Sequence, residues 1–151
     1  MKTVMSIILS CLLWAPLAHA SEHDVLMIRS SLPFPEAMSN LQNSIIEHQY
    51  TLSRVQRVDI GLEKAGYKTD RYRVVFFGKQ EELKLITDAY PQMGAYLPLK
   101  FAIFAEEDET MLVALNPLHF QQIVDTPEYN VLFKRWASDI KSIMRDVRVA
   151  E

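Results

Sequence analysis

Residues 96–117 read YLPLKFAIFAEEDETMLVALNP, and this stretch decides the fold class of the chain. Two strongly apolar runs, Leu99–Ala105 and Thr110–Leu115, flank the acidic segment Glu106–Glu109, and the second run ends at Asn116-Pro117. Short apolar runs bounded by turn residues are typical of β-strands. The stretch therefore predicts an antiparallel hairpin in the core, with a solvated acidic turn at its tip.

The start of the chain differs from the rest. Lys2 precedes an apolar run over residues 4–17, and Ala18-His19-Ala20 offers the small residues that a signal peptidase requires. The run is shorter than the roughly 20 apolar residues that a membrane span needs. We expect residues 1–20 to be a signal peptide, and residues 21–151 to form a single domain in the periplasm or outside the cell. No stable membrane span is expected after processing.

The composition excludes several functional classes. The formal net charge is -3 with both signs scattered along the chain, so the basic stripe that nucleic acid requires is absent from the sequence. The only cysteine, Cys11, lies in the predicted signal peptide. The mature chain is therefore expected to have no disulfide, no thiol nucleophile and no cysteine-based metal site.

The rest of the chain alternates predicted strands and helices. A period of two residues indicates a strand, and apolar residues three and four apart indicate a helix. Besides the hairpin, predicted strands cover Asp24–Ser31, Tyr50–Asp59 and Tyr72–Gly78, and predicted helices cover residues 34–47, 60–65 and 81–89.

A long helix is predicted at the C-terminus. Thr126-Pro127-Glu128 combines a capping residue, a proline at the first helical position and an acid in the first turn. A membrane-surface helix is one interpretation and core packing is the one we favour. The expected apolar stripe consists of Tyr129, Leu132, Trp136, Ile140, Ile143 and Val147.

Together these elements predict an α+β fold, with a mostly antiparallel sheet of about five strands, helices on one face and a long C-terminal helix. The strands at Tyr72–Phe77 and Leu99–Phe104 carry apolar residues on both faces. One layer of helices covers one face only. The second face then needs the C-terminal helix, another subunit or a ligand.

The hairpin and its surroundings resemble the domain of unknown function 302 family. The residues that carry the resemblance are Phe77-Gly78, Leu97-Pro98-Leu99-Lys100, the acidic turn and Asn116-Pro117, in this order and spacing. Gln80 departs from the pattern, in which a proline is common at that position. The resemblance implies a compact α+β domain that pairs as a homodimer, and it carries over no catalytic residue.

Lys100 is the charged residue that matches the family pattern. It has two interpretations: an anion anchor in a ligand-binding cleft, or an edge-strand lysine that prevents wrong strand pairing.

A possible metal site arises from processing. Cleavage after Ala20 would create the N-terminus Ser21-Glu22-His23, whose amine, backbone amides and imidazole can bind Cu(II) or Ni(II) in a square-planar arrangement. The acids Glu106–Glu109 lack the glycine and the alternating spacing of a calcium loop.

The sequence contains no complete catalytic motif. His48 and His119 stand apart, and HExxH is absent. The favoured hypothesis is an exported, non-enzymatic domain that binds a small ligand or a periplasmic partner. A copper- or nickel-handling protein and an enzyme with an unrecognised site are the alternatives.

Overall fold

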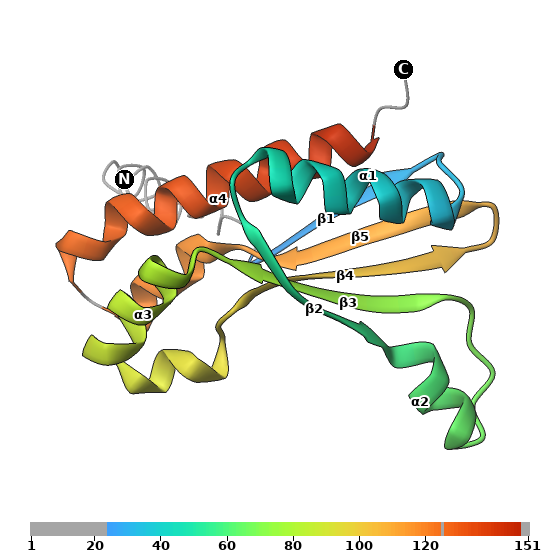
Figure 1. Cartoon of the computed structure of the whole chain (residues 1–151), viewed down its shortest axis with the longest axis horizontal. Coiled ribbons are helices and arrows are strands. Elements are labelled where there is room, and N and C mark those ends of the chain that lie inside the picture. Colours follow the sequence, from blue (N-terminus) through green and yellow to red (C-terminus); the bar gives the residue numbers. More distant parts are fainter. Residues whose placement is uncertain (1–23, 125, 149–151) are drawn as a thin grey trace, which may run out of the picture.

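The computed structural model describes residues 24–124 and 126–148, which form a five-stranded sheet with helices packed on it (Figure 1). All neighbouring strands are antiparallel, in the order β1-β5-β4-β3-β2, which confirms the predicted α+β class. The strands are β1 (Val25–Ser30), β2 (Thr51–Arg57), β3 (Tyr72–Gly78), β4 (Leu99–Glu106) and β5 (Glu109–Leu115); the helices are α1 (Phe34–Glu47), α2 (Val58–Lys64), α3 (Gln80–Ala89) and α4 (Pro127–Arg148), with short 3-10 helices η1 (Pro91–Ala95) and η2 (Pro117–Gln122).

The hairpin of β4 and β5 forms as predicted, with a tighter turn. Glu106 pairs with Glu109, so that only Glu107 and Asp108 connect the strands. Glu107 adopts a φ of 55°, in the left-handed region that two-residue hairpin turns require. β4 occupies the centre of the sheet, between β5 and β3.

α1 and α4 lie side by side on one face of the sheet and create the core (Figure 1). The rings of Phe77 and Phe101 stack there with centroids 5.0 Å apart, and both side chains are fully buried. Burying each side chain of this size stabilises the fold by about 1.5–3 kcal/mol. The C-terminal helix α4 therefore covers the same face of the sheet as α1. The interpretation that it covers the opposite face is wrong.

The buried stripe of α4 contains every predicted residue except Leu132, and it also contains Phe133, Ala137 and Met144. Leu132 is only partly buried, whereas Phe133 is fully buried. Phe133 packs edge-on against Phe120 of η2 at 5.6 Å and lies 5.8 Å from Trp136. The sequence spacing allowed either residue, and the aromatic ring supplied by η2 selects Phe133.

The second strand is shorter than predicted. β2 ends at Arg57, and α2 begins at Val58 rather than at Ile60. Asp59 stabilises this early start, because its carboxylate pairs with Arg73 and accepts a hydrogen bond of 2.9 Å from the backbone of Ile60. A register shift between Leu52 and Arg54 also interrupts the regular alternation of β2.

No helix within residues 24–124 and 126–148 is long and apolar enough to cross a membrane.

Candidate functional site

The sheet face opposite α1 and α4, which we call the open face, is apolar across four strands. Side chains alternate along a strand, so the neighbours of buried Val75, Phe101 and Leu112 point to this face. Figure 1 shows α2 beside β3 at one end of the strands, and near the other end Leu83 of α3 approaches this face at Gly78. The apolar residues of the open face are Val25, Met27, Tyr72, Val74, Phe76, Ala102, Phe104, Met111, Val113 and Leu115.

Exposure on the open face is greatest at its β1 edge. Met27 is 59% exposed and Val25 is 49% exposed. Most of the residues on β3, β4 and β5 are partly buried by their neighbours, and Met111 is buried. In soluble proteins, large contiguous exposed apolar patches are found preferentially at interaction sites.

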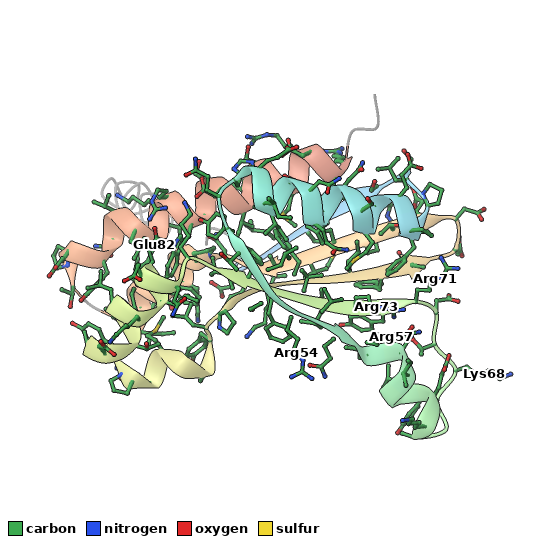
Figure 2. All side chains as sticks on the ribbon, in the orientation of Figure 1. Arg54, Arg57, Lys68, Arg71, Arg73 and Glu82 are labelled. Carbon is green, nitrogen blue, oxygen red and sulfur yellow. The ribbon has the colours of Figure 1, made fainter. Side chains whose placement is uncertain are left out.

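Two cations flank one aromatic ring of the open face. The strand register places Phe76 in one row between Arg54 of β2 and Lys100 of β4. The Nζ atom of Lys100 lies 5.9 Å from the centroid of the Phe76 ring and donates a hydrogen bond of 3.2 Å to the carbonyl of Tyr96. Figure 2 shows the side chain of Arg54 on the side of the sheet away from α1 and α4. In the described part of the chain, no carboxylate lies within ion-pair distance of either cation.

The opposite end of the open face is acidic. Arg29 pairs with Glu106 at 2.8 Å and with Glu109 at 2.7 Å, and the turn adds Glu107 and Asp108. These groups are about half exposed or more, so the ion pairs add little stability. Along β4, Lys100 and Glu106 are six residues apart, which is about 20 Å in a strand. The open face therefore has a positive end and a negative end.

A hollow of about 510 Å³ adjoins the positive end. Gly78 lies two residues after Phe76, so it faces the same side of the sheet, and Leu83 of α3 sits where a side chain at position 78 would begin. The volume falls in the range of small-molecule sites. Its lining residues are Thr51, Ser53, Gly78, Gln80, Leu83, Lys84 and Thr87.

The structure thus brings Lys100 to the open face and rejects one of its two interpretations. β4 is the central strand, so Lys100 cannot protect a sheet edge. The reasoning from sequence missed Arg54. Regular alternation would place it on the same face as Leu52, but the register shift pairs Leu52 with Phe77 and Arg54 with Phe76, on opposite faces.

The other predicted site residues do not join this site. Ser21, Glu22 and His23 lie outside the described residues. Nδ1 of His119 is 3.2 Å from Asp24, and Nε2 of His48 is 3.4 Å from Asp146. Within residues 24–124 and 126–148, no group of three or more histidine, cysteine or acidic side chains is arranged to hold a metal ion.

A separate polar cluster joins α3 to α4. Glu82 accepts hydrogen bonds of 2.7 Å from Arg135 and from the indole nitrogen of Trp136, and Figure 2 shows it at this contact between the helices. Nearby, Tyr50 donates a hydrogen bond of 2.7 Å to Asp139. Burial and this hydrogen bond raise the pKa of Tyr50. These groups satisfy one another, which makes the cluster structural.

Comparisons with known proteins agree with the fold. The family model "Domain of unknown function DUF302" matches residues 26–147. A crystal structure of an uncharacterized conserved DUF302 protein from Bacillus stearothermophilus superimposes with a TM-score of 0.74. The two share 13% sequence identity over 83% of this chain and 98% of the other, so the likeness concerns the fold alone. No curated protein matches the chain.

Proposed function

We propose that this chain, which belongs to the Domain of unknown function DUF302 family, is an exported, non-enzymatic binding domain. It binds its ligand or partner on the open face. The observation that carries this proposal is the apolar sheet face that α1 and α4 leave uncovered, with Lys100 at one end. An exposed apolar surface is unfavourable in water unless a ligand or a partner covers it. Lys100 supplies an anchor for an anionic group of a small ligand or of a periplasmic partner.

Two copies of the chain are proposed to associate through the β1 edge of this face. Val25 and Met27 are its most exposed apolar residues and lie on an edge strand. A second copy would remove both from water and leave the part of the open face over β3 and β4 for the ligand. The ligand then lies beside the seam between the copies.

Native mass spectrometry tests this proposal on protein expressed with its own first 20 residues and collected from the periplasm of a bacterial host. The expected species begins at Ser21, has twice the mass of one chain and retains additional mass. Met27→Asp is expected to give monomers, and Val74→Asp to lose the retained mass. Val131→Asp is the matched control, because Val131 is 75% exposed on α4 and far from the open face in the fold.

Three results would contradict separate parts of the proposal. A mass that still includes residues 1–20 would contradict export. A bare monomer would contradict both the homodimer and a tightly held ligand. Retained mass that survives Val74→Asp would place the ligand elsewhere on the protein.

A further inference from the structure

We infer that the ligand of the open face is an anionic amphiphile, with its carboxylate or phosphate head between Arg54 and Lys100 and its apolar part along β3 and β4. The inference rests on the proposed function, and it adds the chemical class and the orientation of the ligand. It follows from the distribution of charge around the apolar surface.

The head position follows from the two cations. Arg54 and Lys100 are separated by β3, which places their Cα atoms about 10 Å apart, at two strand spacings. Both side chains are long and flexible, so their charged ends can converge on one anion above Phe76. The Phe76 ring lies below that point and excludes water from one side. Hydrogen bonds between two charged partners are about twice as strong as neutral ones.

The hollow beside Gly78 lies next to the proposed head position, since Gly78 follows Phe76 by two residues and Ser53 precedes Arg54. The hydroxyl-bearing residues Thr51, Ser53 and Thr87 line it together with Lys84. Two of these hydroxyls are donors to backbone carbonyls: Ser53 to Phe76 at 3.1 Å and Thr87 to Leu83 at 2.9 Å. Lys84 pairs with Asp88, so Arg54 and Lys100 carry the main attraction.

The apolar part of the ligand is directed away from the hollow. Val74 and Ala102 form the row next to Phe76, and Tyr72 and Phe104 form the row after it, with ring centroids 5.3 Å apart. Beyond them lies the acidic end with Glu106 and Glu109. A negative head placed there would meet carboxylates, so the charges allow one orientation of the amphiphile on the face.

Isothermal titration calorimetry tests the inference on the exported protein, with ligands below their micelle concentrations. The probes share one alkyl chain and differ in the head: dodecyl phosphate, dodecanoate, dodecyltrimethylammonium and dodecyl maltoside, with inorganic phosphate as a head without a chain. We expect one of the two anionic amphiphiles, or both, to bind at least about tenfold more tightly than the cationic and neutral ones. Tighter binding of dodecyl phosphate or of dodecanoate identifies the head group of the ligand as a phosphate or as a carboxylate.

Variants separate the head from the apolar part. Arg54→Ala/Lys100→Ala is expected to weaken anionic binding by about tenfold or more, to the level of the neutral probe. Lys68→Ala/Lys134→Ala is the matched control, because it removes two exposed lysines outside the site, and Lys68 appears beyond α2 in Figure 2. Ala102→Asp is expected to remove binding of every dodecyl probe. Thermal unfolding checks that each variant folds.

The outcomes distinguish this inference from the proposed function. Equal affinity for all dodecyl probes, lost in Ala102→Asp, would overturn the anionic class and leave the open face as a binding surface. Inorganic phosphate that binds as tightly as dodecyl phosphate would overturn the amphiphile. If no probe binds while the exported protein retains another mass, the inference alone fails; a bare monomer without affinity for any probe would overturn both.

Discussion

Replacement of Glu82 by alanine should destabilise the protein far more than replacement of its neighbour Glu81. The Glu82 side chain is 22% exposed and accepts hydrogen bonds from Arg135 and from fully buried Trp136. Glu82→Ala leaves the indole N–H of Trp136 without its acceptor, which costs about 2 kcal/mol. Arg135 is 41% exposed, so its lost ion pair adds about 0.5 kcal/mol. We expect a decrease of about 2–3 kcal/mol in the free energy of unfolding.

Urea denaturation followed by far-ultraviolet circular dichroism measures this loss. Glu81→Ala is the matched control, because Glu81 is an exposed acid in the same first turn of α3, and both changes remove a favourable interaction with the helix dipole. In a Trp136→Phe background, which lacks the indole N–H, Glu82→Ala should cost about 2 kcal/mol less. The reasoning is refuted if Glu82→Ala costs no more than Glu81→Ala, or if its cost is unchanged in that background.

Three further changes test other parts of the structure. Gly78→Ala should cost about 1–3 kcal/mol of stability because the new methyl group collides with Leu83, and a double-mutant cycle with Leu83→Ala should remove most of this cost; an unchanged cost would contradict the contact. The hydrogen bond from Arg73 lowers the pKa of Asp59, so the stability that this carboxylate contributes is present above its unfolded pKa of about 3.9 and is lost as the pH falls through the lower folded value. Urea midpoints measured from pH 6 to pH 2 should therefore fall less steeply in Asp59→Asn than in the unchanged protein, and parallel curves would contradict this pairing. Exported protein that begins at Ser21 should bind one equivalent of Cu(II) with a square-planar visible spectrum, and His23→Ala should abolish that spectrum; if it persists, the copper ligands lie elsewhere.

Much of the fold could be predicted because local patterns and tertiary structure agree. The alternation in residues 99–115 and the cap at Thr126-Pro127-Glu128 depend on neighbouring residues in the chain, and both elements form as expected. Phe133 was missed because the choice between it and Leu132 depends on Phe120, a contact between separate elements. Spacing within one helix cannot contain that information.

The candidate site was predictable in part for the same reason. Alternation identified apolar residues on both faces of β3 and β4, and the family pattern drew attention to Lys100. Which face the C-terminal helix covers depends on its packing against α1, which no local pattern encodes. Arg54 reaches the open face through an irregularity of β2, and a sequence that is read with strict alternation places it on the wrong side.

The most direct test of the open face as the binding surface is a methyl spectrum of exported protein labelled with ¹³C-methyl methionine and titrated with dodecyl phosphate and, separately, with dodecanoate. Met111 lies on the open face opposite Phe104, whereas Met38 and Met144 belong to α1 and α4 on the other side of the sheet. We predict that the Met111 resonance moves in proportion to the ligand bound, while those of Met38 and Met144 keep their positions. Movement of Met38 or Met144 with Met111 unchanged, or a spectrum that neither dodecyl phosphate nor dodecanoate alters, would contradict the account.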